Sequence, residues 1–275
     1  MTILLGLDGG GSICRARAVD AAGRLVGEGV AGPANITTDL DGALAAILAA
    51  SSAALGTHDP GAVKAALGLA GANDPVAARK LQDRLPFLES RVVTDGHISV
   101  LGALGQADGI VAAIGTGSVF IAQRGGTQRE IGGKGLILGD EASGAWMGRK
   151  LLSRVLRSAD GFEPMTPLCH RTLDEMGTAA GIIAFAARAR PADFATLASR
   201  VTASDDPAAR AILAEAGDEC TRAVEILQGG KDLPVVLLGG LAPVFAPILA
   251  RRWTVAQPDG TALDGAILLA RSSVS

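Results

Sequence analysis

The feature that most constrains the fold is a strand-like apolar run that meets a glycine-rich turn and continues into a second strand-like run. This pattern occurs twice, as ILLGLDGGGSICRARAVD from Ile3 to Asp20 and as IVAAIGTGSVFIAQR from Ile110 to Arg124. Connections this short join antiparallel neighbours, so each copy predicts a β-hairpin. The repetition predicts an α/β chain built from two related units.

The remaining elements follow the same plan in both halves, with strand patterns first and helical patterns after them. We expect strands over 3–8, 13–19, 25–30, 63–70, 91–94, 110–114, 119–123, 128–131 and 234–238. We expect helices over 39–55, 74–85, 96–104, 146–157, 179–189, 208–227, 246–253 and 262–271. Because the second strand-turn-strand unit starts at Gly109, the boundary is placed near residues 106–109, and no low-complexity linker separates the halves.

Composition supports a folded protein and argues against nucleic acid as a partner. The chain has 275 residues, of which 48% are hydrophobic and 19% charged, enough for a large core in one or two domains. The net charge is −3, no block of Lys and Arg occurs, and aromatic residues make up only 3%. Neither a basic surface nor base stacking is therefore expected.

The sequence also shows no pattern typical of a signal peptide or of a membrane-spanning helix. The segment 2–30 has no basic start, and Asp8 interrupts its apolar run, so it is not a signal peptide. No stretch reaches the ~18 uninterrupted apolar residues of a membrane helix. Three cysteines, odd in number and far apart, fit a reducing compartment. We expect a soluble, cytoplasmic protein with no membrane partner.

The two glycine turns are candidate phosphate-binding sites, because successive backbone N–H groups without side chains form an anion-binding concavity. Asp8 at the end of the first strand is the candidate ligand of Mg²⁺, directly or through water. Neither the Rossmann fingerprint nor the P-loop fits, since strand-like runs follow both turns and no G-x-x-x-x-G-K-[ST] is present. A tight hairpin without a ligand is the alternative interpretation of each turn. The candidate phosphate-binding residues are Gly9, Gly10, Gly11, Ser12, Gly115, Thr116 and Gly117.

Five motifs in order resemble the BadF/BadG/BcrA/BcrD ATPase family of the actin/hexokinase-like superfamily, and within it the N-acetylglucosamine and glucosamine kinases. They are DGGGS at 8–12, TDGHISVLGA at 94–103, GTGS at 115–118, LGDEASGAWMGRK at 138–150 and VVLLGGLAP at 235–243. The resemblance implies two ribonuclease-H-like α/β domains with a nucleotide cleft between them. It assigns 1–107 to the N-terminal domain, to which a helix within 262–275 returns, and 108–261 to the nucleotide-binding domain.

The resemblance also implies roles for individual residues. Asp95 stands where the general base for the sugar hydroxyl belongs, and Gly239 and Gly240 where adenosine approaches the backbone. Val119 departs from the pattern of the mammalian-type N-acetylglucosamine kinases, which have an Asn directly after GTGS. The sugar-binding residues implied by the resemblance are Asn35, Gly71, Ser118 and Asp140.

Several of these residues keep a purely structural interpretation from sequence. Asp95, or Asp140 with the following Glu141, could act as a helix N-cap, a position that Asp fills well. Asn35 could be a turn residue after Pro33.

The expected function is an ATP- and Mg²⁺-dependent kinase acting on the 6-hydroxyl of N-acetylglucosamine or glucosamine, and the resemblance is compatible with a homodimer. The departure at Val119 leaves open whether the sugar is N-acetylated. An alternative within the family is an ATPase activator of a 2-hydroxyacyl-CoA dehydratase or benzoyl-CoA reductase, which carries an iron–sulfur cluster. Cluster ligation needs neighbouring thiolates, and Cys14, Cys169 and Cys220 are widely spaced, which weighs against it. A third interpretation, a non-catalytic sugar sensor, predicts loss of the base or of the phosphate-binding turns. Asp95, Asp8 and both glycine turns are present in this sequence, which weighs against it.

Overall fold

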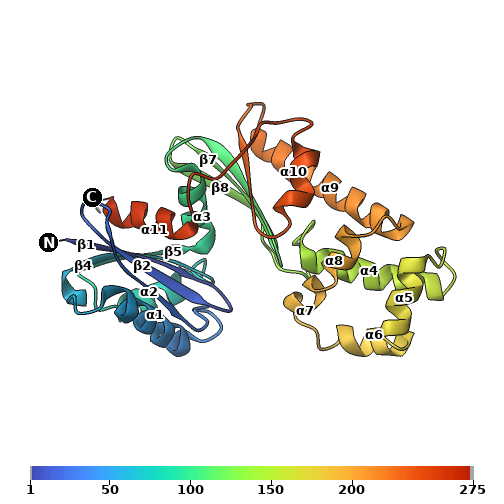
Figure 1. The fold of residues 1–275 in the computed structure, drawn as a ribbon, viewed down its shortest axis with the longest axis horizontal. Coiled ribbons are helices and arrows are strands. Elements are labelled where there is room, and N and C mark those ends of the chain that lie inside the picture. Colours follow the sequence, from blue (N-terminus) through green and yellow to red (C-terminus); the bar gives the residue numbers. More distant parts are fainter. Residues whose placement is uncertain (1, 273–275) are drawn as a thin grey trace. The chain divides into compact units, whose positions relative to one another are not determined.

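A computed structural model describes residues 2–272 of the chain (Figure 1). These residues form two compact units. The first consists of the chain up to Ala107 together with the segment that begins at Gln257, and the second is Asp108–Ala256. No helix within 2–272 is long and apolar enough to cross a membrane.

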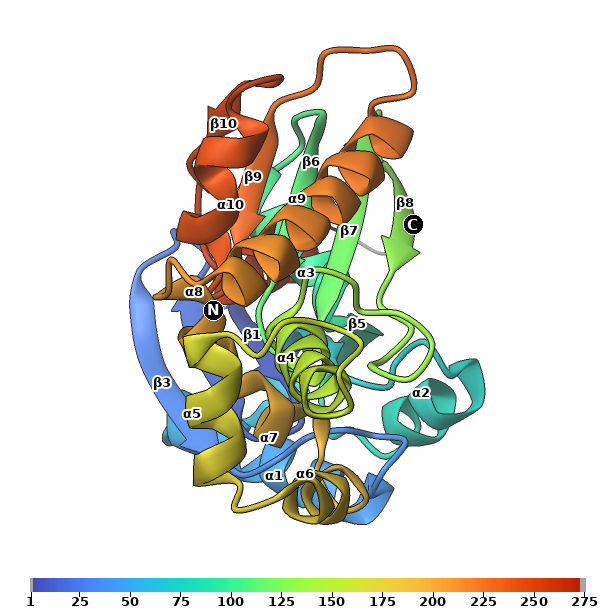
Figure 2. The same cartoon turned by 90° about the vertical axis from the view of Figure 1, so that its right-hand side faces the viewer.

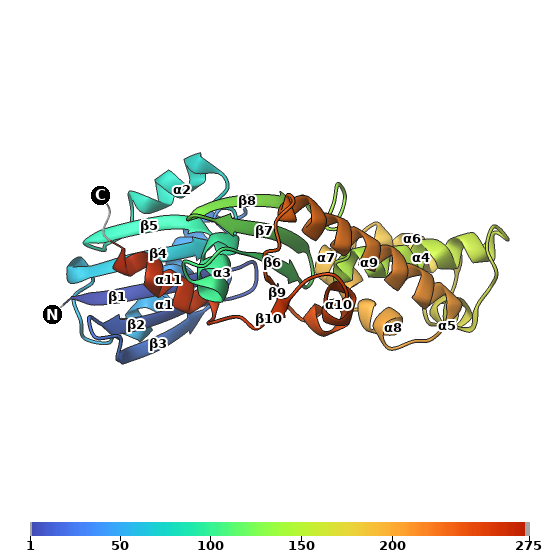
Figure 3. The ribbon, with the colours of Figure 1, turned by 90° about the horizontal axis from the view of Figure 1, so that it is seen from above.

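The first unit is built on a five-stranded sheet in the order β3-β2-β1-β4-β5, which can be followed in Figure 3. The first three strands form an antiparallel meander, whereas β1, β4 and β5 are parallel. The carboxyl ends of β1, β4 and β5 therefore meet at one edge. The strands are β1 (Ile3–Gly9), β2 (Cys14–Asp20), β3 (Leu25–Ala31), β4 (Val63–Leu69) and β5 (Glu89–Thr94).

Helices cover both faces of this sheet (Figure 1). Leu5 and Leu7 of β1 belong to a core cluster with α1 (Leu40–Leu55) and α2 (Pro75–Gln82). Leu4, which points to the opposite face, packs with α3 (Asp95–Leu104) and α11 (Ala262–Arg271). This alternation is the period of two expected of a strand buried on both faces. A 3₁₀ turn, η1 (Pro60–Ala62), precedes β4.

The second unit repeats this sheet, with the order β10-β9-β6-β7-β8. Again the first three strands form an antiparallel meander, and β6, β9 and β10 are parallel. The helix α9 (Pro207–Gln228) crosses β6 and β7, as Figure 2 shows. The strands are β6 (Gly109–Ile114), β7 (Ser118–Arg124), β8 (Thr127–Gly132), β9 (Val235–Leu238) and β10 (Val255–Ala256). The other helices are α4 (Gly144–Ala159), α5 (Pro167–Glu175), α6 (Ala179–Ala186), α7 (Pro191–Ala195), α8 (Ala198–Thr202) and α10 (Ala242–Leu249).

The shared strand order confirms the predicted internal duplication and the α/β fold of two ribonuclease-H-like units. One predicted helix is displaced: 246–253 is observed as α10, Ala242–Leu249. The helix starts early because Pro243 suits the first turn of a helix. Among the elements that were not predicted, α5 has a readable start, with Thr166 as its N-cap and Pro167 at its first position.

Candidate active site

In the first unit, the predicted site residues gather at the carboxyl edge of the parallel strands. The register sets Gly9 of β1 beside Leu69 of β4, and Leu69 beside Thr94 of β5. The DGGGS turn, Gly71 and Asp95 all follow directly from these positions. The carboxyl ends of the strands are where open α/β sheets bind ligands.

The first glycine turn closes on itself but leaves two amides open. The Gly10 N–H donates to the Ile13 carbonyl at 2.9 Å, and the Gly10 carbonyl accepts from Ala34 N at 2.9 Å. Among the hydrogen bonds of the described residues, none uses the amide of Gly11 or Ser12, and both residues are exposed. The anion-binding capacity of this turn is therefore concentrated at Gly11 and Ser12.

Gly9 has a different role from its neighbours, because it is buried within β1. A Cβ atom at Gly9 would lie 2.6 Å from Cδ2 of Leu69 and 2.9 Å from Cβ of Ala34. Both distances are shorter than ordinary van der Waals contact. Close packing accounts for the glycine at this position.

Asp8 is a half-buried carboxylate next to other charges. Burial raises the pKa of Asp8, the neighbouring carboxylate of Asp95 raises it further, and the guanidinium of Arg15 lowers it. Arg15 lies directly opposite Asp8 in the β1–β2 register. Arg15 was not singled out from the sequence, because counting outward from a GGGS turn pairs Asp8 with Ile13, whereas in the structure Gly9 is still paired, with Cys14, and Asp8 falls opposite Arg15.

The Asp8–Asp95 pair fits a divalent cation. The carboxylate of Asp95 raises the pKa of Asp8, and a cation bound between two neighbouring carboxylates would stabilise their charged forms. Within the described chain, no cluster of three or more His, Cys, Asp or Glu could enclose a metal ion. Mg²⁺ does not need such a cluster, because it commonly binds one or two protein carboxylates and keeps water and phosphate oxygens as its other ligands.

Asp95 is the first residue of α3 and is exposed. The N-cap of this helix is Thr94, whose Oγ1 accepts from the His97 N–H at 3.1 Å, so the N-cap interpretation of Asp95 is wrong. Its own Oδ1 accepts from Gly96 N at 2.9 Å. A negative charge in the first turn is favoured by the helix dipole, and capping does not account for this aspartate.

Asn35 and Gly71 are neighbours at the same edge. The Asn35 Oδ1 accepts from Thr37 N at 3.0 Å, Thr37 Oγ1 at 2.8 Å and Thr38 N at 3.2 Å, so the turn interpretation of Asn35 is confirmed. Among the hydrogen bonds of residues 2–272, none uses the Nδ2 donors of Asn35. Gly71 has φ +87°, and a Cβ there would lie 2.9 Å from the Asn35 Oδ1. Asn35 and Gly11 line one cavity of about 490 Å³.

In the second unit, the GTGS turn is fixed against the start of α4. The Gly115 N–H donates to the Gly117 carbonyl at 2.9 Å, and the Gly115 carbonyl accepts from Gly144 N at 2.8 Å. The Thr116 carbonyl accepts from Ala145 N at 3.1 Å. The amides of Thr116 and Gly117 take part in no hydrogen bond among the described residues, which leaves two open donors in this turn as well.

Asp140 contacts the GTGS turn from a strained position. It is only 8% exposed and has φ +57°, which is uncommon for a residue other than glycine. Its Oδ1 accepts from Gly135 N at 3.0 Å, and a Cβ on Gly117 would lie 2.8 Å from its Oδ2. Burial is the main cause of its raised pKa, with a further increase from Glu141 that the hydrogen bond from Gly135 opposes.

The N-cap interpretation of Asp140 and Glu141 is wrong, because Ser143 caps α4 and accepts from Trp146 N at 3.1 Å. Ser118, expected at the sugar, is 5% exposed and donates its hydroxyl to the Glu141 carbonyl at 2.6 Å. This bond ties the GTGS turn to the GDEAS segment, which gives Ser118 a structural role.

The glycine pair after β9 lies against the same turn. Gly239 has φ +90°, and a Cβ there would lie 2.4 Å from the Ile114 carbonyl oxygen. That oxygen accepts from Leu241 N at 3.1 Å. Gly240 is exposed, and no neighbouring atom lies within 4 Å of the position of a Cβ. Gly239 is thus required by packing, and Gly240 keeps its backbone open.

The cysteines do not form a cluster site. Cys14 is buried in the core of the first unit, and Cys169 and Cys220 are buried in that of the second. Side chains enclosed in apolar cores cannot present thiolates to an exposed iron–sulfur cluster, which weighs against the activator alternative.

Comparison with known proteins agrees with this arrangement. The model of the BadF/BadG/BcrA/BcrD ATPase family matches residues 5–246. Glucosamine kinase GspK of Vibrio cholerae serotype O1 is 30% identical over 98% of this chain and 96% of its own length. An N-acetylmuramic acid/N-acetylglucosamine kinase of Clostridium acetobutylicum is 28% identical over 58% of this chain and 55% of its own.

A solved structure is also similar over nearly the whole chain. It is a protein of Chromobacterium violaceum provisionally described as an N-acetylglucosamine kinase. The two share 32% identity and a TM-score of 0.89, over 98% of this chain and 99% of the other.

Proposed function

Because the chain belongs to the BadF/BadG/BcrA/BcrD ATPase family, we propose that it is an ATP-dependent kinase that phosphorylates the 6-hydroxyl of glucosamine or N-acetylglucosamine. The similarity to glucosamine kinase over almost the full length supports an amino sugar as the acceptor. The observation that carries the proposal is the exposed carboxylate of Asp95, which lies close to Asp8 at the carboxyl edge of the sheet. Helix capping does not account for this aspartate, because Thr94 is the N-cap of α3.

The phosphates of ATP are the proposed ligands of the open amides. Gly11 and Ser12 in one turn, and Thr116 and Gly117 in the other, each offer N–H groups that no described residue uses. Backbone donors of this kind bind anions without reorganising. Gly240 is the proposed place where adenosine approaches the chain, since no neighbouring atom of the described residues lies within 4 Å of the position of a Cβ there.

Asp8 is the proposed protein ligand of Mg²⁺, directly or through water. The ion would neutralise charge on the phosphates of ATP when bound. Arg15, opposite Asp8, holds the pKa of that carboxyl lower than burial alone would. It therefore keeps Asp8 ionised to lower pH.

The sugar is proposed to bind beside Asp95. Its carboxylate would accept or orient the proton of the attacking hydroxyl, which is the main task left to a side chain in phosphoryl transfer. Asn35 would use its uncommitted Nδ2 donors, and Gly71 its backbone. Asp140 would supply a carboxylate to sugar hydroxyls in charge-assisted hydrogen bonds.

The preference for a free or an acetylated amino group depends on the surroundings of Val119. Its side chain packs by Gly133, where Cγ2 would lie 3.3 Å from a Cβ. An apolar side chain cannot hydrogen-bond an acetamide, so any N-acetyl recognition must come from other groups.

An ADP-release assay with Mg-ATP tests the proposal, using glucosamine, N-acetylglucosamine, N-acetylmannosamine, N-acetylmuramic acid and glucose as acceptors. We expect turnover with an amino sugar, and an absence of sugar-dependent ADP release with all five would refute the kinase. Asp95→Asn should lower kcat by a factor of about 10² or more while ATP still binds. The matched control is Asp59→Asn, at the N-cap of η1, which should leave kcat unchanged because Asn caps as well as Asp.

A further inference from the structure

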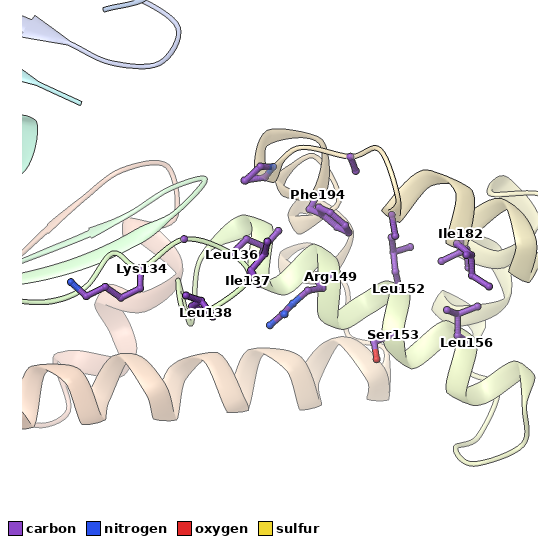
Figure 4. A pocket seen from close by; sticks show the side chains of 15 residues that line it. Lys134, Leu136, Ile137, Leu138, Arg149, Leu152, Ser153, Leu156, Ile182 and Phe194 are labelled. Carbon is purple, nitrogen blue, oxygen red and sulfur yellow. The ribbon is translucent and has the colours of Figure 1, made fainter. Parts of the chain in front are cut away.

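A groove in the second unit contains none of the residues assigned to ATP or sugar. It lies between the loop at 134–138, the helices α4 and α6, and the start of α7, and has a volume of about 950 Å³ (Figure 4). This volume is in the range of cavities that hold small organic ligands. We call it the apolar groove.

The wall of the apolar groove is almost entirely hydrophobic. Leu152 and Leu156 of α4, Ile182 of α6 and Phe194 of α7 lie along it (Figure 4). Its other lining residues include side chains that remain in water, namely Ile137 at 88%, Leu138 at 83% and Ile183 at 60% exposure. Large exposed apolar side chains that gather at one concavity mark a binding site.

Two basic side chains lie toward one end of the groove. Lys134 and Arg149 are on the side of Leu136–Leu138, away from the end formed by Leu156 and Ile182 (Figure 4). Both are exposed, and neither forms an ion pair within the described chain.

The unpaired state of Arg149 is unlike that of the other basic residues of α4. Lys150 is paired with Glu215, whereas Arg154 and Arg157 are both paired with Glu163. The one α4 cation without a carboxylate partner within the described chain is thus the one that lines the groove.

We propose that the apolar groove binds a single-chain aliphatic carboxylate. The chain would lie along Leu152, Leu156 and Ile182, and the carboxylate would pair with Arg149, whose planar fork matches it. Positive charge toward one end and an apolar wall elsewhere are complementary to an anionic head with one apolar tail. A neutral or cationic amphiphile would leave both guanidinium and ammonium unpaired.

Titration calorimetry with decanoate below its micellar concentration tests this site on the full-length protein. We expect saturable binding of one decanoate per chain. The affinity should fall about fourfold for each methylene removed, measured with octanoate and hexanoate. Decyltrimethylammonium, which has the same tail and the opposite charge, should bind at least tenfold more weakly. No saturable binding, or equal binding of the two head groups, would overturn the proposal.

Surface variants locate the site without disturbing the core. Arg149→Gln should weaken decanoate binding about fivefold, and Ile183→Ser about tenfold. The matched controls are Arg210→Gln and Ile226→Ser on α9, an exposed arginine and a 47%-exposed isoleucine outside the groove. Equal losses in the control variants would show that decanoate binds elsewhere.

Sedimentation velocity separates this site from an interface between copies of the chain. We expect Ile183→Ser and decanoate to leave the sedimentation coefficient unchanged. If Ile183→Ser dissociates an oligomer and decanoate does not bind, the groove holds a second copy and the proposal is wrong.

Discussion

Replacing Gly239 with alanine should destabilise the second unit, whereas the same replacement at the adjacent Gly240 should not. At Gly239 the new Cβ would lie 2.4 Å from the Ile114 carbonyl oxygen and 2.7 Å from its carbon, and the backbone has φ +90°. The left-handed conformation costs an alanine about 1–2 kcal/mol. Overpacking against fixed backbone adds about 1–3 kcal/mol.

The expected loss at Gly239 is therefore about 2–5 kcal/mol in the free energy of unfolding. At Gly240 no atom lies within 4 Å of the new methyl group and φ is not left-handed, so no comparable loss arises. Gly240→Ala should change stability by less than about 1 kcal/mol, with any gain coming from a less flexible unfolded chain.

Tryptophan fluorescence during urea unfolding is the appropriate assay. Both tryptophans of the chain, Trp146 and Trp253, lie in the second unit, so the signal reports on that unit. With a slope of about 1–3 kcal/mol per M, the midpoint of Gly239→Ala should fall by roughly 1 M or more. Equal midpoints for the two variants would refute the packing argument.

The steady-state kinetics of Gly240→Ala then test whether this turn binds the nucleotide, separately from its effect on stability. Gly240→Ala should raise the KM for ATP and leave the KM for the sugar unchanged, because the methyl group would obstruct only the approach of adenosine. An unchanged KM for ATP would remove Gly240 from the nucleotide site while leaving the stability argument about Gly239 intact.

Three further predictions follow from single contacts. Asp8→Asn should abolish Mg²⁺-dependent turnover yet stabilise the ligand-free protein at pH 7. Because the folded-state pKa of Asp8 is raised, the stability of the wild-type protein falls as the pH rises through that pKa. The urea midpoints of the two proteins should therefore converge below pH 4, where the carboxyl is protonated in both the folded and the unfolded state. Arg15→Gln should move the acidic limb of the kcat/KM profile to higher pH, because Arg15 lowers the pKa of Asp8; an unmoved limb would contradict this. Ser118→Ala should cost about 1 kcal/mol, measured by urea unfolding, through loss of its bond to the Glu141 carbonyl; an unchanged midpoint would count against its structural role.

Local patterns were enough to predict the elements that carry the site. The apolar run before the glycines predicted 3–8 as a strand, observed as Ile3–Gly9, and the short GGGS connection predicted an antiparallel partner, observed as Cys14–Asp20. Both predictions depend on the composition of a short run and on turn length, which are properties of adjacent residues. The duplication was readable for the same reason.

The caps were assigned less well, because the start of a helix depends on one or two residues. Asp95 and Asp140 were credible N-caps by residue type, yet Thr94 and Ser143 fill those positions. Hydroxyl and carboxylate side chains cap equally well, so type alone could not choose between neighbours. The structure removes the capping explanation for both aspartates, and their role at the sugar remains our proposal.

The sequence by itself determined that two glycine turns follow two equivalent strands, because glycine and strand periodicity act over a few residues. Only the tertiary structure decided which backbone groups in those turns remain open. That depends on partners distant in sequence, such as Gly144 N on the Gly115 carbonyl and Ala34 N on the Gly10 carbonyl. Each long-range bond occupies a group that the local pattern leaves unassigned, and the unoccupied amides are what a phosphate can bind.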